Sequence, residues 1–478
     1  MGQKTYVLDP YKQSGVPDDL MASYNPLDQL QEDDEEVIDK ASDLAGSLVI
    51  RSKGEDSHFD DSARSLVKAL LLYVTLNAPE EQKTLPYVHS LLMRGARDQM
   101  TADMGDDIAD AEMDPFRYLL HMMEEEDRFE GIISGIASTL LDMGDREYGS
   151  VMSTTRRNLE FLERPGIRRV FSKSTFSLDE LKNDPKGVTI YLCLPTSRMD
   201  DCGRFLRVMI TAQLNSIYAD PKQPSCGHPI LFLLEEFATL KHMEAIESAA
   251  GYAAEFGLKL WIILQDLSQL KRHYKEGWET FLGNASVVQA FGNSDWATLD
   301  YLSKKLGETE TVQTTRNTTQ SLSASSNDAG DFQRTQSMLQ NRGAGSFLNP
   351  FTLLVDQEST GQSATTTTAF NQQIQRSPLM LHNEIERTFR REAMTQLLSI
   401  KGEHPFAIHR ENYFETPEFY GLFEPDRPPY RSLKEAQALR NKELKLREEQ
   451  ISRLILDAEH FVRQTEQSIA AAKKQAKR

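Results

Sequence analysis

Two adjacent carboxylates at the end of an apolar run are the residues best suited to chemistry. Residues 230–234 read Ile-Leu-Phe-Leu-Leu and lead directly into Glu235 and Glu236. In an open parallel sheet, ligands bind beyond the carboxyl ends of the strands, so both acids would face that crevice. This is the arrangement of a Walker B element, in which the first carboxylate holds Mg²⁺ through water and the second orients the attacking water. Taken alone, the pattern also fits a strand that ends in a solvated acidic turn.

A second polar group follows the next predicted strand. Residues 258–264 are mostly apolar and end at Gln265. If the two strands are neighbours, the Gln265 amide lies beside the same crevice, where one hydrogen bond can sense the terminal phosphate of a nucleotide. The alternative is that this amide caps the helix that follows.

Other catalytic and metal-binding patterns are missing from the sequence. The Gly-x-x-x-x-Gly-Lys-[Ser/Thr] loop that cradles the β- and γ-phosphates is absent, and no Gly-Lys dipeptide occurs in the 478 residues. The ten histidines show no HxxxH spacing, and Cys193, Cys202 and Cys226 show no CxxC spacing. These patterns argue against zinc or thiol chemistry and favour reduced cysteines in a cytosolic compartment.

The charge distribution limits the contacts that the chain can make with nucleic acid. The formal net charge is −18, so any binding to phosphates depends on local basic groups. Candidate contacts with the DNA backbone are Arg156, Arg157, Arg168 and Arg169, although ordinary surface charge is the safer explanation for them. Residues 101–130 are strongly acidic, which fits a solvated loop or a docking site for a basic protein.

The periodicity of the apolar residues predicts the elements that position these groups. Residues 35–162 have helical spacing, whereas after Pro165 apolar strands alternate with helices, which is typical of a parallel sheet covered on both faces. Residues 311–375 are rich in Ser, Thr, Gln and Asn, which predicts a mobile segment. The predicted parts are the first part of an α/β domain (1–33), an all-α insertion (34–165), the main α/β part (166–310), a low-complexity mobile segment (311–376), the closing part of the α/β domain with two strands (377–428), and a basic C-terminal helix (429–478).

Several segments occur in an order that resembles the type IV secretion coupling proteins. These are hexameric ATPases that feed single-stranded DNA into a conjugation channel. The similarity covers most of residues 1–310 and resumes near Ser377. It is carried by Tyr6-Val7-Leu8-Asp9-Pro10, Tyr24-Asn25-Pro26-Leu27, residues 59–73, residues 190–195, Glu235-Glu236-Phe237, residues 264–270, and residues 284–291 with Asp295.

This resemblance implies an α/β fold with a RecA-like, mostly parallel sheet interrupted by an all-α domain that helps to select cargo. It implies ATP and Mg²⁺ as cofactors of the complete protein, with Glu235 on the metal through water and with Glu236 and Gln265 at the reacting phosphate. Aspartate is usual where Glu235 stands, and the extra methylene shifts an ion that tolerates little distortion. Family resemblance places the phosphate-binding loop and the membrane helices upstream of residue 4, so we expect Met1 to be a truncated or internal start, and nucleotide binding by this chain alone stays open.

The same resemblance implies partners and a location. The expected function is recruitment of relaxosome cargo and translocation of single-stranded DNA by a hexameric ring at the cytoplasmic face of the bacterial inner membrane. Expected partners are the relaxase, relaxosome proteins and components of the secretion channel. Candidates for an arginine finger are Arg376, Arg387, Arg390 and Arg391. The missing phosphate loop keeps a second hypothesis open, namely a catalytically silent adaptor that retains the cargo-docking helices.

Overall fold

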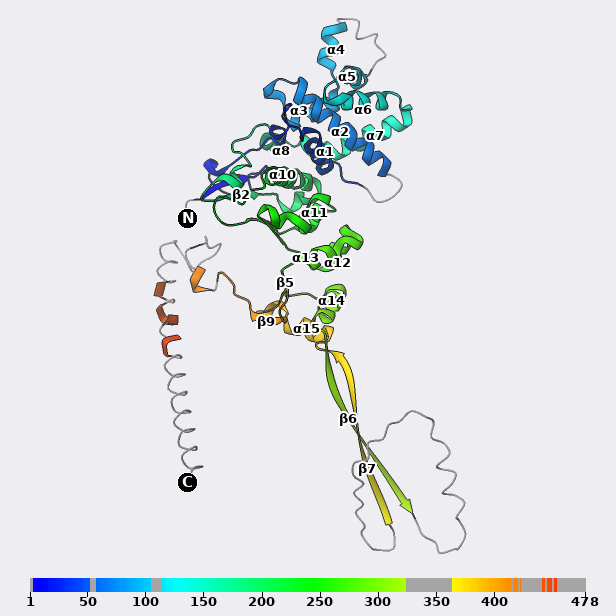
Figure 1. The fold of residues 1–478 in the computed structure, drawn as a ribbon, viewed down its shortest axis with the longest axis vertical. Helices are drawn as coiled ribbons and strands as arrows, with labels where there is room; N and C mark the ends of the chain where they lie inside the picture. The colour runs from blue at the N-terminus through cyan, green and yellow to red at the C-terminus, as the bar shows by residue number, and fades with distance from the viewer. Residues whose placement is uncertain are drawn as a thin grey trace, which may run out of the picture. The chain divides into compact units, whose positions relative to one another are not determined.

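The computed structural model describes residues 3–51, 57–104, 114–323, 363–414, 416–419, 422, 441–442, 445–448 and 451–453. The chain divides into two units, Met1–Val288 and Gln289–Arg478 (Figure 1). No helix in the described ranges is both long enough and apolar enough to cross a membrane.

The first unit begins with two strands that are far apart in the sequence. Strand β1 (Lys4–Leu8) pairs in parallel with β2 (Val188–Leu192). Asp9 ends β1, and its buried carboxylate accepts hydrogen bonds from the backbone N–H groups of Tyr11 and Ser14 at 3.0 and 2.7 Å. These bonds form the turn in which the Asp-Pro sequence stops the strand.

The described residues between β1 and β2 form helices and no strands, as the periodicity predicts. The amphipathic segments bury their apolar stripes against one another. The α-helices are α1 (Val37–Leu48), α2 (Ser57–Asn77), α3 (Leu85–Arg94), α4 (Arg97–Met104), α5 (Pro115–Glu124), α6 (Ile132–Leu141), α7 (Asp145–Leu159), α8 (Pro165–Val170) and α9 (Glu180–Asn183).

This helical block shares its core with the strands that flank it. A single cluster of buried side chains runs from Leu8 of β1 through Leu70 of α2 to Phe171 and Phe205. The rings of Phe171 and Phe205 lie 5.4 Å apart, which joins the end of the block to helix α10 (Met199–Ala219). The insertion is therefore fixed to the α/β part by apolar packing.

A second core lies under another pair of parallel strands. Strand β3 (Ile230–Leu234) pairs with β4 (Leu258–Ile262), and the helices α10, α11 (Glu244–Tyr252), α12 (Leu267–Tyr274) and α13 (Trp278–Asn284) supply side chains to this core. Gly257 adopts φ +74° at the turn into β4, a backbone conformation that residues other than glycine rarely adopt. Phe232 is buried on the helix side, whereas Leu231 and Leu233 are exposed on the other side. Helices were predicted to cover both faces of the sheet. In the structure they cover only one face of this strand pair.

The described residues of the second unit include two α-helices and a small three-stranded sheet, whose first strand begins just before the boundary of the unit. Its strand order is β5 (Val287–Ala290), β8 (Thr395–Ile400) and β9 (Phe406–His409), with β8 and β9 antiparallel. Helices α14 (Trp296–Leu306) and α15 (His382–Thr388) pack with β8 around a core that includes Leu299, Ile385 and Leu397. The two closing strands predicted after residue 377 are present.

Part of the segment that was predicted to be mobile, residues 311–376, lies in paired strands in the structure. Residues 311–323 and 363–376 lie in β6 (Glu308–Ser323) and β7 (Ser363–Pro378), which pair antiparallel along their whole length (Figure 1). Threonine is β-branched and favours strands, so a Thr-rich stretch too polar for a core can still form a two-stranded ribbon. Residues 324–362 and most of the predicted C-terminal helix lie outside the described residues, and residues 441–442, 445–448 and 451–453 are helical.

Candidate functional site

The pairing of β3 and β4 brings the predicted site residues to one edge. Leu234 lies opposite Ile262, and the N–H of Ile263 donates to the Leu234 carbonyl at 3.0 Å. Since the strands are parallel, Glu235, Glu236 and Gln265 all follow the carboxyl ends of neighbouring strands. The structure therefore brings these three side chains to the same edge, as expected for a crevice at the end of an open α/β sheet.

The turn after β3 is anchored by a buried aromatic ring. Glu236 precedes the short helix η8 (Phe237–Leu240), and its carbonyl accepts from the N–H of Thr239 at 2.9 Å. Phe237 is buried and stacks on Tyr274, with ring centroids 5.6 Å apart and an interplanar angle of 6°. Burying this one ring fixes the backbone while the carboxylates of Glu235 and Glu236 stay exposed.

Helix α12 is capped by Asp266, the residue after Gln265. The Asp266 carboxylate accepts from the N–H of Gln269 at 2.9 Å, which is the standard contact of an N-cap. The amide oxygen of Gln265 accepts from the Gln269 side chain at 3.4 Å. The capping role proposed as the alternative for Gln265 is thus filled by its neighbour, and the Gln265 amide stays exposed at the strand end.

The donor set at this edge fits Mg²⁺ bound together with a nucleotide. In the described ranges, no group of three or more His, Cys, Asp and Glu side chains is placed to hold a metal ion. Mg²⁺ typically takes one or two carboxylates and fills its octahedron with water and phosphate oxygens. Neither the carboxylate of Glu235 nor that of Glu236 has a hydrogen-bond or ion-pair partner among the described residues, so both are available for such a role.

A buried arginine that the sequence analysis missed holds the loop behind these carboxylates. Arg207 of α10 is almost fully buried, and its Nη1 donates to the carbonyls of Leu240 and His242, both at 2.7 Å. On its other side it donates to the carbonyls of Ser47 at 3.0 Å and Gly46 at 3.3 Å. Burial lowers the pKa of Arg207 to about 10, so the side chain remains charged at neutral pH. One guanidinium therefore links the end of α1 to the segment that follows Glu235 and Glu236.

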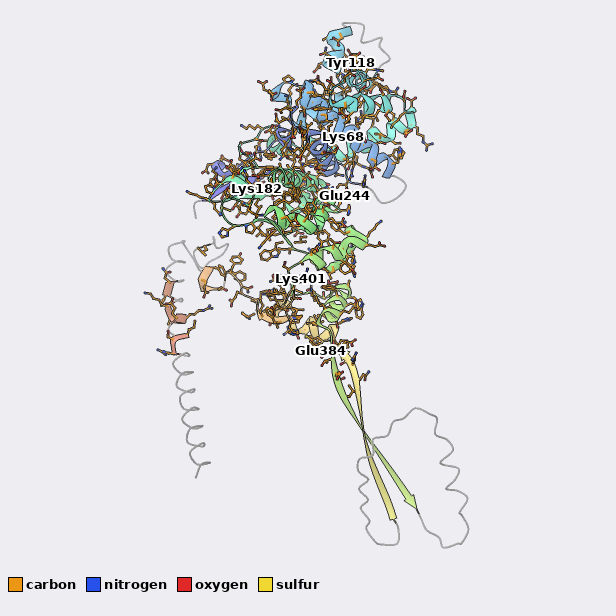
Figure 2. The ribbon with its side chains drawn as sticks, viewed as in Figure 1. Lys68, Tyr118, Lys182, Glu244, Glu384 and Lys401 are labelled. Atoms are coloured by element: carbon orange, nitrogen blue, oxygen red, sulfur yellow. The ribbon has the colours of Figure 1, made fainter. Side chains whose placement is uncertain are left out.

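Two further arginines bind the same end of α1. Arg204 Nε donates to the Leu48 carbonyl at 3.1 Å, and Arg64 Nε donates to the Val49 carbonyl at 3.0 Å. The last carbonyls of a helix carry partial negative charge and lack partners within the helix, so cations stabilise them. Nearby, Arg51 forms an ion pair at 3.2 Å with Glu244 of α11. Glu244 is labelled in Figure 2. The signal that could have revealed Arg207 is a charged residue within the apolar pattern of residues 203–218.

The arginines proposed as DNA contacts differ in their surroundings. Arg168 is half-buried and donates to the Pro86 carbonyl at 3.3 Å, and Arg169 donates to the Asp9 carbonyl at 3.1 Å. Both side chains therefore bind the backbone of other segments of the first unit. Arg156 and Arg157 are exposed at the end of α7.

The arginine-finger candidates all lie in the second unit. Arg376, Arg387, Arg390 and Arg391 are exposed. Arg376 lies on β7, 3.9 Å from the carboxylate of Glu310 on β6. That one of these guanidinium groups reaches the nucleotide of a neighbouring subunit stays a prediction.

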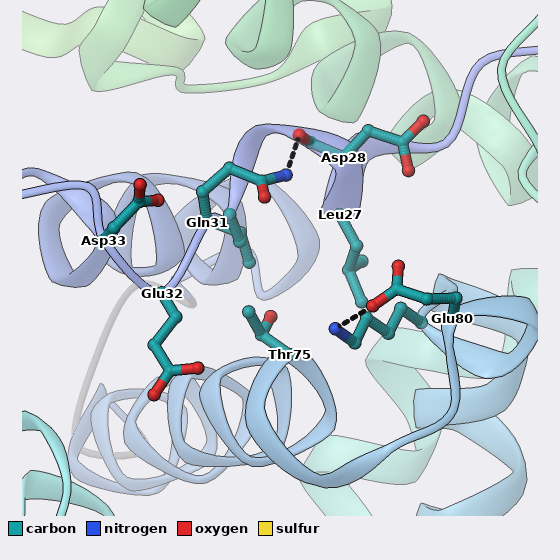
Figure 3. Close-up of a pocket in the computed structure, with 9 residues that line it drawn as sticks. Leu27, Asp28, Gln31, Glu32, Asp33, Thr75 and Glu80 are labelled. Atoms are coloured by element: carbon teal, nitrogen blue, oxygen red, sulfur yellow. Dashed lines mark hydrogen bonds and ion pairs between the residues drawn. The ribbon is translucent and has the colours of Figure 1, made fainter.

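The first unit also contains a cavity of about 430 Å³ whose lining is rich in carboxylates (Figure 3). It lies between residues 27–33 and the end of α2, and Lys83 at its rim pairs with Glu80. The carboxylates at the cavity are those of Asp28, Glu32, Asp33 and Glu80. Such a concentration of negative charge repels phosphate groups, so the cavity is not a nucleotide site.

Comparisons of the sequence with known proteins identify similar proteins. A family model described as type IV secretory system conjugative DNA transfer matches residues 1–341. The conjugal transfer protein TraG of Escherichia coli is 26% identical over 303 residues, which cover 61% of this chain and 45% of that protein. The protein VirD4 of Rhizobium radiobacter is 26% identical over 290 residues, which cover 60% of this chain and 38% of that protein. The chain thus spans less than half the length of these two relatives.

Solved structures of the bacterial conjugative coupling protein TrwB share the fold. One, in complex with sulphate, aligns with a TM-score of 0.55 at 15% identity over 86% of this chain and 75% of that chain. Another, in complex with ADP and Mg²⁺, aligns with a TM-score of 0.54 at 14% identity over 85% of this chain and 74% of that chain. The predicted fold class, a RecA-like α/β fold with an all-α insertion, is confirmed.

Proposed function

The chain belongs to the family of type IV secretory system conjugative DNA transfer proteins, and from this premise we propose that it is the nucleotide-hydrolysing edge and cargo-docking part of a coupling ATPase. In this role it drives single-stranded DNA towards a secretion channel. The observation that carries the proposal is that Glu235, Glu236 and Gln265 follow the carboxyl ends of two paired parallel strands. Two carboxylates and an amide at this edge can supply a metal ligand, a base for the attacking water and one contact to the phosphate, which are three of the groups that phosphoryl transfer to water uses.

Each residue at this edge has a distinct task in the proposed reaction. Glu235 follows β3 directly and would hold water on Mg²⁺, which when bound neutralises charge on the phosphates. Glu236 lies one residue further and accepts a proton from the attacking water. Gln265 donates a hydrogen bond from its amide to the terminal phosphate.

The helical block provides a physical link between cargo and nucleotide. Arg207 binds carbonyls at the end of α1 and carbonyls of the loop after Glu236, so a shift of either segment is transmitted to the other. Packed interiors and buried hydrogen-bond networks transmit displacements because they resist local deformation. We assign docking of relaxosome proteins to this block, and contacts with the DNA backbone to the exposed Arg156 and Arg157 of α7. By the same family argument, the working form is a ring at the cytoplasmic face of the inner membrane.

Hydrolysis of ATP by the purified chain tests this proposal. With single-stranded DNA present, we expect DNA-stimulated hydrolysis that falls at least 100-fold in Glu236→Gln, because the substituted amide cannot accept the proton. Glu255→Gln, which alters an exposed carboxylate of the same unit, serves as the matched control and should retain the wild-type rate. Equal rates in the wild type and Glu236→Gln would contradict the assigned role.

A second candidate function is a silent adaptor. It is favoured by one observation, the lack of any Gly-Lys dipeptide in the sequence. An adaptor would bind a relaxase or an accessory protein with unchanged affinity in Glu236→Gln and would hydrolyse no ATP under any of these conditions.

A further inference from the structure

Strands β6 and β7 form a ribbon with two open edges. Each strand has 16 residues, so at about 3.3 Å per residue the ribbon is roughly 50 Å long. Among the described residues, the two strands pair only with each other. The outer edge of each strand therefore presents a row of backbone N–H and C=O groups that can pair with a further strand.

These edges lack the features that normally prevent pairing with a further strand. Proteins protect edge strands with lysines, prolines or bulges, or by keeping the strands short. The 16 pairs of β6 and β7 follow one register from end to end, so the ladder contains no bulge. Residues 311–323 and 363–375 contain no lysine, proline or glycine, and Arg316 is their only charged residue. Long, regular and almost uncharged edges of this kind favour the addition of another strand.

The ribbon receives little support from the core of its own unit. Among the described side chains, the core that includes Leu299, Ile385 and Leu397 contains none from β6 or β7. A two-stranded ladder by itself is only marginally stable in water. Pairing with further strands would therefore stabilise the ribbon.

Apolar side chains are exposed where the ribbon meets the helices of its unit. The exposed fractions of Ile374, Leu379 and Leu381 are 66%, 52% and 51%. Trp296 of α14 is 72% exposed, and its ring centroid lies 4.3 Å from that of His382, the residue after Leu381. Large apolar side chains that are exposed in one region are typical of a surface that another protein covers.

A second copy of the chain offers the edges that fit. The almost uncharged strands do not suit nucleic acid, which needs clustered basic groups, whereas threonine-rich strands pair favourably with each other. Rotation about an axis parallel to the ribbon keeps the direction of every strand. It therefore places β6 of one copy antiparallel to β7 of the next, as within one ribbon.

We propose that the ribbon pairs edge to edge with the ribbons of neighbouring copies of this chain, with β6 of each copy against β7 of the next. A head-to-tail contact of this kind repeats around a ring, and it leaves no edge open when the ring closes. The inference concerns assembly and does not depend on the roles of Glu235, Glu236 and Gln265.

Self-association of the full chain, measured by analytical ultracentrifugation, tests this proposal. We expect the wild type to form oligomers larger than dimers. Replacing residues 312–374 by Asn-Gly closes the ribbon directly after the pair Thr311 and Gln375, and should weaken self-association at least tenfold. The matched control replaces residues 324–362 by Asn-Gly, which closes the ribbon after its last pair and should associate like the wild type.

Two proline variants keep the test decisive if the shortened chain does not fold. In an antiparallel ladder, adjacent residues direct their N–H groups alternately to the partner strand and to the outer edge. Of Gln313→Pro and Thr314→Pro, one therefore breaks a bond within the ribbon and the other removes an outward N–H group. The outward variant is the one in which hydrogen exchange of β7 in dilute, monomeric protein matches that of the wild type. It should still weaken self-association at least tenfold.

Every outcome of these measurements decides the inference. Weaker association of the shortened ribbon or the outward proline variant, together with full association of the control, supports the pairing. Equal association of all variants, or a wild type that stays monomeric, overturns it. Weaker association of the control assigns the contact to residues 324–362, and association that stops at a dimer excludes β6 against β7; both results overturn the inference. Glu236→Gln should associate like the wild type, so a failure of the proposed hydrolysis leaves this inference standing.

Discussion

Replacing Arg207 tests the link between the helical block and the loop behind the carboxylates. Arg207→Met keeps most of the volume of the side chain but removes the donors to Leu240, His242, Ser47 and Gly46. Three of these four hydrogen bonds are 3.0 Å or shorter, and each such bond to a charged group contributes about 1.5–3 kcal/mol. The cost of burying the guanidinium offsets part of this sum. We therefore expect a loss of about 3–5 kcal/mol in the free energy of opening this region.

Hydrogen–deuterium exchange read by mass spectrometry measures this opening locally. Since about 1.4 kcal/mol corresponds to a factor of ten, amide exchange at the end of α1 and in residues 237–243 should accelerate by a factor of roughly 10² to 4 × 10³ in Arg207→Met. Exchange in β8 and β9 of the second unit should not change. The matched control is Arg198→Met, which removes an exposed arginine near the start of the same helix and should change exchange by less than about threefold. Equal acceleration in both variants, or a change below tenfold in Arg207→Met, would show that the guanidinium does not hold the two segments together.

Two further predictions concern the stability of the first unit. Burial, and to a lesser extent the nearby Arg168 guanidinium, lower the pKa of His89 below its usual 6.5, so the neutral ring is favoured in the folded state. Its contribution to stability is therefore complete above about pH 6.5 and is lost as the pH falls towards and through the folded pKa. His89→Gln should make the urea midpoint less dependent on pH between 7 and 5, and an unchanged slope would show that other groups set it. Gly166→Ala places a methyl group against the backbone carbonyl of Pro10 and should cost about 2–3 kcal/mol, whereas Gly149→Ala, in an open position of α7, should gain about 0.5–1 kcal/mol in denaturant titrations. Similar effects of the two substitutions would mean that α8 does not pack closely on the turn after β1.

The strand ends that form the candidate site were predictable from the sequence. Two apolar runs, each followed by polar residues, can place Glu235 and Gln265 side by side only if the strands are parallel neighbours, and the register confirms this pairing. Alternation of apolar runs with helical segments indicates parallel strands. The two strands after residue 390 were predictable from a different pattern, namely two short apolar runs separated by a turn. These runs form the antiparallel pair β8 and β9.

Three features could not be predicted, each for a physical reason. Arg207 lies on a helix, where arginines are usually solvated, and its acceptors come from segments distant in the sequence. The exposure of Leu231, Leu233 and Trp261 on one side of β3 and β4 could not be foreseen, because an apolar run looks the same whether one or both faces of its strand are covered. Strands β6 and β7 have a polar composition that favours disorder, and only the β-branched threonines indicated an extended ladder.

Transfer of DNA between cells tests the central claim most directly, because it uses the protein in its native setting. In mating assays with the native element, a donor that lacks this gene is complemented with wild type, Glu236→Gln or Glu255→Gln. The account predicts that wild type and Glu255→Gln restore transfer to equal frequencies and that Glu236→Gln lowers it at least 100-fold at equal protein abundance. Full transfer with Glu236→Gln would contradict a catalytic role for the carboxylates at the end of β3.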